Sequence, residues 1–181
     1  MSDGLIPRRY AKALYKYAVE NGDSQEIYEL LKQLSFRYTA IDELKRAVLN
    51  PEISNEDKGA FMLQLMGGKP GSSLDKFLLL CVRNGRAEYL QKISLAYVDL
   101  YREAHEIAHV VITTAAPMPE AEVNAIIDIV KKRLGAMTLE IEQVIDPSLI
   151  GGFTVKINGL VLDASVKREL NELRLQLQKK N

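Results

Sequence analysis

Apolar residues recur every three or four positions through roughly the first hundred residues, the spacing typical of amphipathic helices. Residues that begin or end helices separate these apolar segments, including Ser, Thr and Asp before them and Asn-Gly, Asn-Pro or Gly-Gly after them. The pattern predicts six helices joined by short connections. Their sequences are RYAKALYKYAVE, IYELLKQLSFRY, IDELKRAVL, AFMLQLM, LDKFLLLCVR and a long helix from about Arg86 to about His105.

Several of these helices have a residue that is expected to cap the N-terminus. A capping side chain accepts a hydrogen bond from a backbone N–H in the first turn, and a Glu or Asp three residues later strengthens the signal. Proline is also favoured in a first turn, where Pro7 stands. The other expected caps are Asp23 with Glu26, Thr39, Ser54 with Asp57, and Ser72 or Ser73.

The pattern changes after about residue 106, where short segments predict strands. HVVITTA is β-branched, MTLEIEQVI alternates apolar and polar residues as a half-buried strand does, and Asn158-Gly159 between FTVKI and LVLD predicts a hairpin. EAEVNAIIDIVKKRL has helical spacing, and Ser165 is expected to cap a last helix, VKRELNELRLQLQ. The sequence therefore predicts a six-helix bundle over residues 1–105, followed by a small α+β domain over 106–181 in which two helices pack against a sheet.

Composition excludes several function classes. The chain has 181 residues with 24 Lys+Arg and 24 Asp+Glu, and this zero net charge argues against general nucleic-acid binding and against a polybasic membrane surface. No apolar stretch approaches about 18 residues, so we expect no direct membrane insertion. The single cysteine excludes an internal disulfide. MSDGLIPRRY lacks the apolar core of a signal peptide, so a cytoplasmic location is expected.

One segment, His105-Glu106-Ile107-Ala108-His109, matches the HExxH motif of zinc peptidases. On a helix its two histidines share a face and bind zinc, while the glutamate serves as the general base. The chain has only these two histidines, and His109 begins a predicted strand, so the helix is expected to end near the motif. We therefore favour two solvated linker histidines over a peptidase, and expect no metal, cofactor or catalytic residue.

The first and fifth helices have more apolar surface than a helix on the outside of a monomer needs. In the first helix the charged side chains of Arg9, Lys12, Lys16 and Glu20 gather in one arc, and apolar or tyrosine residues fill the rest. LDKFLLLCVR shows a similar excess. Two interpretations remain open: the helices occupy central positions in their own bundle, or they form a groove that accepts a helix from another protein.

Three segments together resemble a known family. They are Arg9-Tyr10-Ala11-Lys12-Ala13-Leu14, Val82-Arg83-Asn84-Gly85-Arg86, and IDPSLIGGFTVKI from Ile145 followed by VLDASV from Val161. In order and spacing they are similar to the delta subunit of bacterial F-type ATP synthase, whose family includes the mitochondrial oligomycin-sensitivity-conferring protein. With the six-helix and α+β halves, the resemblance covers essentially the whole chain.

The resemblance implies a non-catalytic stator subunit, peripheral at the cytoplasmic face of the bacterial inner membrane, that links the catalytic head to the b-subunit stalk. It also implies that the first and fifth helices bind the N-terminal segment of an alpha subunit, and that the C-terminal domain meets the C-terminal end of the b subunit. An unrelated helical adaptor is the alternative. The residues that the resemblance assigns to the alpha-subunit contact are Tyr10, Ala13, Leu14, Leu78, Cys81 and Val82.

Overall fold

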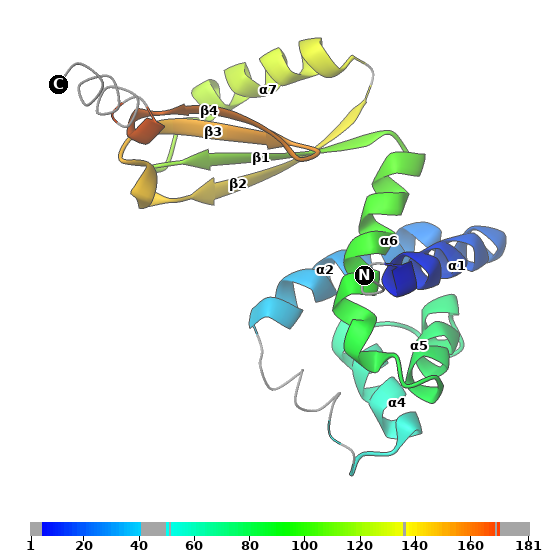
Figure 1. Ribbon diagram of the computed structural model, residues 1–181. Helices are drawn as coiled ribbons and strands as arrows, with labels where there is room; N and C mark the ends of the chain where they lie inside the picture. The colour runs from blue at the N-terminus through cyan, green and yellow to red at the C-terminus, as the bar shows by residue number, and fades with distance from the viewer. Residues whose placement is uncertain (1–4, 41–49, 51, 136, 169, 171–181) are drawn as a thin grey trace. The chain divides into compact units, whose positions relative to one another are not determined.

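The computed structural model describes residues 5–40, 50, 52–135, 137–168 and 170 (Figure 1). The chain divides into two compact units, Met1–Ala104 and His105–Asn181. The boundary expected from the sequence, after residue 105, differs from this division by one residue. The first unit is helical and the second contains a sheet, so the mixed helical and small-sheet fold class is confirmed.

The described part of the first unit consists of helices. They are α1 (Leu5–Asn21), α2 (Ser24–Ala40), α4 (Asn55–Met66), α5 (Ser73–Arg83), the short 3₁₀ helix η1 (Ala87–Tyr89) and α6 (Leu90–Ala104). The predicted helix IDELKRAVL is residues 41–49, which lie outside the described part, so the six-helix count is not confirmed. Thr39 lies within α2 and does not begin a new helix.

The sixth helix begins later than the sequence predicts. Gly85 adopts a positive φ of 64°, and the Arg86 N–H donates to the Cys81 carbonyl at 2.7 Å. These features belong to the end of α5, because a residue in the left-handed conformation closes a helix and redirects the chain. The α-helix therefore resumes at Leu90, after η1.

α6 lies at the centre of the first unit and packs against α1 and α2. Its buried residues include Ile93, Tyr97 and Tyr101. Tyr101 stacks on Tyr28 of α2 with ring centroids 4.3 Å apart, and Tyr97 meets Tyr15 of α1 edge to face at 5.9 Å. Such aromatic pairs add to the free energy gained by burying their area, so the tyrosines join three helices.

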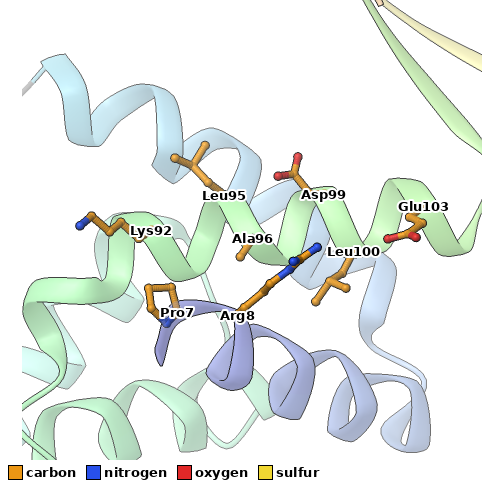
Figure 2. Close-up of a pocket in the computed structure, with 8 residues that line it drawn as sticks. All are labelled: Pro7, Arg8, Lys92, Leu95, Ala96, Asp99, Leu100 and Glu103. Atoms are coloured by element: carbon orange, nitrogen blue, oxygen red, sulfur yellow. The ribbon is translucent and has the colours of Figure 1, made fainter. Parts of the chain in front are cut away.

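An open pocket of about 370 Å³ is lined by α6 and the start of α1 (Figure 2). Arg8 and Lys92 contribute positive charges to its lining, while Asp99 and Glu103 contribute negative ones. Leu95 supplies an apolar side chain that is half exposed. Because the two signs of charge are mixed, the lining does not select a ligand of one charge, and we assign it none.

The N-terminal caps of α4 and α5 form as predicted. The Ser54 hydroxyl accepts from the Asp57 N–H at 3.1 Å, and the Ser72 hydroxyl accepts from the Asp75 N–H at 3.3 Å. Each bond satisfies a first-turn donor that has no partner within its own helix. Of the two serines considered for α5, Ser72 is therefore the cap.

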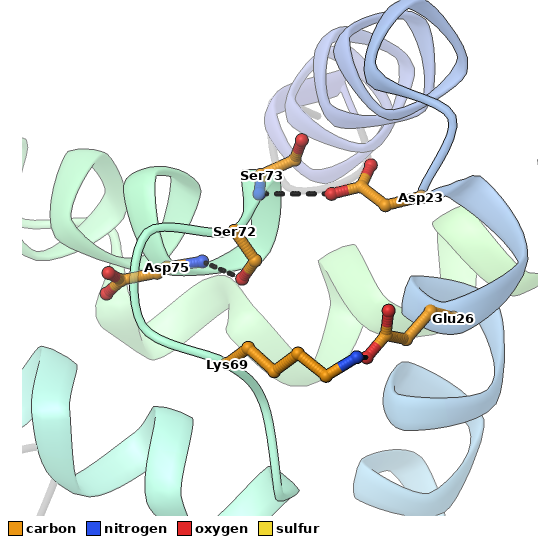
Figure 3. Close-up of polar contacts among 6 residues, drawn as sticks. All are labelled: Asp23, Glu26, Lys69, Ser72, Ser73 and Asp75. Carbon is orange, nitrogen blue, oxygen red and sulfur yellow. Dashed lines mark hydrogen bonds and ion pairs between the residues drawn. The ribbon is translucent and has the colours of Figure 1, made fainter.

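The capping box predicted for Asp23 and Glu26 is wrong, although α2 begins where it was expected (Figure 3). Asp23 Oδ2 accepts from the Ser73 N–H of α5 at 3.1 Å, and Glu26 Oε1 lies 2.9 Å from Lys69 Nζ. Both carboxylates thus reach residues far away in the sequence. The local pattern failed because the folded chain offers each carboxylate a positively polarised partner outside α2.

The second unit is a four-stranded sheet with the helix Glu120–Leu134 on one face. Its elements are β1 (Ile107–Thr114), α7 (Glu120–Leu134), β2 (Thr138–Ile145), the 3₁₀ helix η2 (Pro147–Leu149), β3 (Gly152–Ile157) and β4 (Leu160–Ser165). The strand order is β2-β1-β3-β4; β1 pairs parallel to β2 and antiparallel to β3. The core between α7 and the sheet includes Val110, Ile112, Val123, Val130 and Val155.

The last predicted helix is capped as expected. The Ser165 hydroxyl accepts from the Arg168 N–H at 3.3 Å, and the Ser165 N–H donates to Asp163 Oδ1 at 2.9 Å. Hydrogen bonds from Ser165 lower the pKa of Asp163 below its ordinary value, because they favour the ionised carboxylate. Residues 169 and 171–181 lie outside the described part, so the packing of a second helix on the sheet stays a prediction.

Candidate partner-binding site

Helices α1 and α5 lie side by side and antiparallel. Near the start of α1, the Tyr10 hydroxyl accepts from Asn84 Nδ2 at 3.3 Å, just beyond the end of α5. Near the end of α1, the Tyr17 hydroxyl accepts from Lys76 Nζ at 3.3 Å, close to the start of α5. The tyrosine near the start of α1 thus contacts the end of α5, and the tyrosine near the end of α1 contacts its start. The two helices therefore run in opposite directions. Both bonds lie on the exposed side of the helix pair.

Four of the six residues expected at the alpha-subunit contact are buried in the core of the first unit. Leu14 is 1% exposed, Leu78 and Cys81 are 0% exposed, and Val82 is 4% exposed. Their side chains lie beneath the helix pair and offer no surface to another protein. For these four residues, the structure agrees with the interpretation that apolar side chains of α1 and α5 lie at the centre of their own bundle. Their role in binding another protein stays a prediction.

Tyr10 and Ala13 are accessible, unlike the other four. Ala13 is exposed, and the half-buried Tyr10 ring meets Phe77 edge to face at 6.2 Å. In sequence, Ala13 lies between Tyr10 and Tyr17 of α1, and Leu80 lies between Lys76 and Asn84, the residues that these tyrosines contact. Leu80 is 49% exposed. A narrow strip that combines aromatic, small and aliphatic side chains therefore follows the junction of the two helices.

Sequence reasoning missed three residues of this strip: Tyr17, Lys76 and Leu80. Tyr17 is 38% exposed, and the Lys76 ammonium lies 5.8 Å from the centroid of its ring. A signal was present, because Tyr10, Ala13 and Tyr17 are spaced three and four residues apart and so share one face of α1. We call the five residues Tyr10, Ala13, Tyr17, Lys76 and Leu80 the α1–α5 strip.

Cys81 follows Leu80 in α5, is buried, and is chemically inert there. Burial raises the pKa of its thiol to about 12, because the charged thiolate would lose its hydration. A cysteine acts as a nucleophile or metal ligand in its thiolate form. The structure therefore leaves Cys81 as a small apolar residue of the core.

The HExxH motif does not lie on one helix. α6 ends at Ala104, so His105 falls in the turn that follows, and Glu106 has a positive φ of 52°. His109 lies in β1, where its Nε2 is 3.0 Å from Glu142 Oε2 of β2. Glu142 is thus a side-chain partner of His109 across the two strands. Among the described residues, no three or more His, Cys, Asp or Glu side chains group as metal ligands.

A second apolar surface lies in the sheet unit, between α7 and the edge strand β4. It is a cavity of about 460 Å³ that we call the α7–β4 trough. Leu160 is 79% exposed, Ile129 is 66% exposed and Leu162 is 54% exposed. Phe153 forms part of its lining, and Arg133 adds a charge. The part of the sheet next to the edge strand β4 is thus not covered by α7 or by any other described element.

Comparison with known proteins separates the function classes that the residues leave open. The family model described as the ATP synthase delta (OSCP) subunit matches residues 6–177. An ATP synthase subunit delta from Phocaeicola vulgatus is 36% identical over 179 residues, covering 98% of this chain and 96% of the relative. One from Bacteroides thetaiotaomicron is 37% identical over 183 residues, covering 100% and 98%.

The chain belongs to the ATP synthase delta (OSCP) subunit family. It is therefore a non-catalytic subunit of the peripheral stalk of F-type ATP synthase, and neither the helical adaptor nor the zinc peptidase is supported. The fold agrees with this assignment. A chain in the cryo-EM structure of the Toxoplasma gondii mitochondrial ATP synthase hexamer superimposes with a TM-score of 0.71 at 21% identity, covering 95% of this chain and 97% of that one.

Family membership makes the chain a peripheral part of the ATP synthase complex. None of the described helices has the length and apolar character needed to cross a bilayer. Among the described residues, the α1–α5 strip of the first unit and the α7–β4 trough of the second are two candidate partner surfaces.

Proposed function

We propose that the α1–α5 strip binds the N-terminal segment of an ATP synthase alpha subunit as an amphipathic helix. The supporting observation is that α1 and α5 are antiparallel neighbours. Both expose apolar side chains, while their buried residues belong to the core of the first unit. A helix that docks in such a groove inserts side chains at helical spacing. Ala13 is small and exposed, Leu80 is half exposed and Tyr10 is half buried, so the strip offers a small residue between larger apolar ones.

The chemistry of the strip also sets limits on the bound segment. Aromatic residues dominate the energetics of protein interfaces when water is excluded around them, and the strip has two tyrosines. Their hydroxyls are already bonded to Asn84 and Lys76, so the rings are held in place before binding. Side chains that are fixed beforehand lose less conformational entropy on association. The strip therefore fits a helix with a narrow apolar face.

Two leucines of nearly equal exposure provide a matched test of this proposal. Leu80 of the strip is 49% exposed, and Leu95 of α6 is 48% exposed. Leu80→Asp should weaken binding of an alpha-subunit N-terminal peptide at least about tenfold, because a carboxylate would be desolvated in the interface without a partner. Leu95→Asp should leave the affinity unchanged. Titration calorimetry on the full chain measures both, with a thermal melt of each variant.

The comparison gives a clear result in either direction. Equal affinities for the two variants, with melts like that of the parent, would place the binding site elsewhere on the first unit. Ala13→Asp provides a second probe on α1, and it should act in the same direction as Leu80→Asp. Because both positions are exposed, these substitutions disturb the core less than a change at Leu78 would.

We also propose that the α7–β4 trough receives the C-terminal end of the b subunit. The trough is apolar and open, and its exposed leucine and isoleucine side chains have no cover within the described sheet unit. Exposed apolar surface of this kind is typical of protein interaction sites. The chain would then join the catalytic head to the stalk and hold the head against the torque of the rotor, at the cytoplasmic face of the bacterial inner membrane.

The test of the trough uses two isoleucines. Ile129 lines the trough and is 66% exposed, whereas Ile150 lies after η2 outside the trough and is 65% exposed. Ile129→Asp should reduce pull-down of the b subunit's soluble part by the full chain, while Ile150→Asp should not. Ile150 has a positive φ of 68°, which aspartate tolerates better than isoleucine, so the control variant should fold. Equal retention of the b subunit by both variants would argue against the trough.

A further inference from the structure

Asp23 joins the end of α1 to the start of α2 through its backbone. Gly22 has a φ of 74°, the Gly22 N–H donates to the Val19 carbonyl at 3.3 Å, and the Asp23 N–H donates to the Ala18 carbonyl at 3.1 Å. These two bonds form a Schellman motif, which closes a helix. The Asp23 carbonyl then accepts from the Ile27 N–H at 3.1 Å as α2 begins. The backbone of Asp23 is therefore fixed by both helices.

The side chain of Asp23 reaches a third helix (Figure 3). Its Oδ2 accepts from the N–H of Ser73, the first residue of α5, at 3.1 Å and across 50 residues of sequence. First-turn N–H groups lack partners within their helix, and the helix dipole favours a negative charge at this end. α5 thus has two caps: the nearby Ser72 hydroxyl and the distant Asp23 carboxylate.

The neighbouring polar contacts do not perform the same task. The Lys69–Glu26 ion pair joins α2 to the loop before α5, but its side chains are 75% and 47% exposed, and exposed pairs contribute little. The Tyr97 hydroxyl donates to the Ser24 carbonyl at 3.0 Å and so attaches α6 rather than α5. The Asp23–Ser73 bond is part-buried and is directed at the start of α5.

This bond lies at one end of the α1–α5 strip. Tyr17 and Lys76 stand near that end, while the bond between Tyr10 and Asn84 closes the opposite end. The helix pair thus has a polar contact near each end, and Ala13 and Leu80 lie between these contacts in sequence. A shift of α5 along α1 would change the spacing of the side chains that a bound helix must match.

We infer that Asp23 is a positioning residue for the α1–α5 strip, where the alpha subunit is proposed to bind. Through Ser73, its carboxylate holds the start of α5 against the end of α1 and so keeps the two halves of the α1–α5 strip in register. This inference rests on the proposed function of the strip. Asp23 itself lies outside the strip, so its effect on binding acts through the position of α5.

The test uses two variants that break the same bond from opposite sides. Asp23→Ala removes the acceptor, and Ser73→Pro removes the donor N–H. Proline is favoured at the first position of a helix, and Ser72 before it is already extended, with φ −65° and ψ 168°. Each variant of the full chain should bind an alpha-subunit N-terminal peptide about five- to tenfold more weakly than the parent, the effect of losing one helix cap.

Three further variants separate positioning from stability. Ser54→Ala removes the cap of α4, which does not form the strip, and should lower the melting temperature similarly while leaving the affinity unchanged. Asp23→Asn keeps an oxygen that can accept from Ser73 and should restore binding. The double variant Asp23→Ala with Ser73→Pro should bind no more weakly than either single variant, because both changes remove one bond.

The outcomes distinguish this inference from the proposed function. If the parent chain does not bind the peptide, the proposed binding of the alpha subunit at the α1–α5 strip is wrong. The inference about Asp23, which rests on that proposal, is then wrong too. If the parent binds and Asp23→Ala binds equally well, or loses no more affinity than Ser54→Ala, the inference alone is overturned. If Asp23→Ala does not fold, Ser73→Pro decides the question against the same Ser54→Ala control.

Discussion

Gly152 begins β3 in a conformation and a space that only glycine fits. Its φ is 73°, and a Cβ atom built there would lie 2.2 Å from the Ala164 carbonyl oxygen of the adjacent strand. Gly159, in the turn between β3 and β4, has a φ of 91°, but a Cβ there would meet nothing within 4 Å. A comparison of the two glycines therefore separates the effect of a steric clash, which only Gly152 would have, from the effect of a positive φ, which both have.

Gly152→Ala should lower the free energy of unfolding of the sheet unit by about 2–4 kcal/mol, since both the backbone strain and the clash with β4 must be relieved. Gly159→Ala should cost only about 1 kcal/mol, the effect of a positive φ alone. Urea unfolding followed by circular dichroism measures both values. Equal losses for the two variants would mean that the close approach at Gly152 relaxes easily.

Cys81 should not react with a thiol reagent in the native protein. Burial raises its pKa to about 12, so at pH 8 the thiolate fraction is about one in ten thousand. Reaction with Ellman's reagent should therefore be negligible at pH 8 and complete after unfolding in guanidinium. Because the pKa is raised, the thiolate becomes a substantial fraction only as the pH approaches 12. Rapid reaction of the native chain would contradict the buried position.

At the scale of elements, strand burial depends on neighbours that the sequence does not reveal. The alternation in MTLEIEQVI predicts a half-buried strand, and β2 forms there. Yet Val144 is 37% exposed and Ile145 is 55% exposed. β2 lies at the edge of the sheet, beside β1 only. An edge strand has a neighbouring strand on one side, so its apolar residues remain partly open to solvent.

The full chain should bind no stoichiometric zinc and hydrolyse no peptide. The HExxH motif is divided between the turn after α6 and β1, so its histidines do not share a helix face as a zincin site requires. Metal analysis of the purified protein after dialysis, with a peptidase assay, tests this expectation. One tightly bound zinc per chain, lost together with a peptidase activity in His109→Ala, would show that the motif is functional.

At the scale of the whole molecule, each unit has its own core. The helical unit buries Leu14, Leu31, Leu78 and Tyr97, whereas the sheet unit buries a separate cluster around Val110 and Ile112. Separate cores of this kind allow separate folding. The division also assigns the two candidate partner surfaces to different units.

Residues 1–104 should therefore fold without the rest of the chain, with a helical circular dichroism spectrum and a cooperative thermal melt. A shorter fragment, residues 1–89, provides the control. It lacks α6 and so loses Tyr97 and Tyr101, whose rings join α1 and α2. The shorter fragment should melt without cooperativity. A longer fragment that also melts broadly would mean that the helical unit depends on the sheet unit.

The sequence by itself determined the features that depend on near neighbours in the chain. The caps at Ser54, Ser72 and Ser165, the four strands and the change from helices to a sheet follow from local hydrogen bonding and from side-chain periodicity. The segments from Arg9 and from Ile145 also supported the correct family. Helical spacing marked α1 and α5 as unusually apolar, but spacing alone does not distinguish a core residue from an interface residue.

Only the tertiary structure decided which of those apolar residues face solvent. Leu14 and Leu78 are covered by other helices, while Leu80, on the same helix as Leu78, stays half exposed. It also decided the partner of Asp23, because the Ser73 N–H lies 50 residues away in sequence and 3.1 Å away in space. Burial and long-range hydrogen bonds depend on the packing of distant segments, and one segment's sequence does not contain that information.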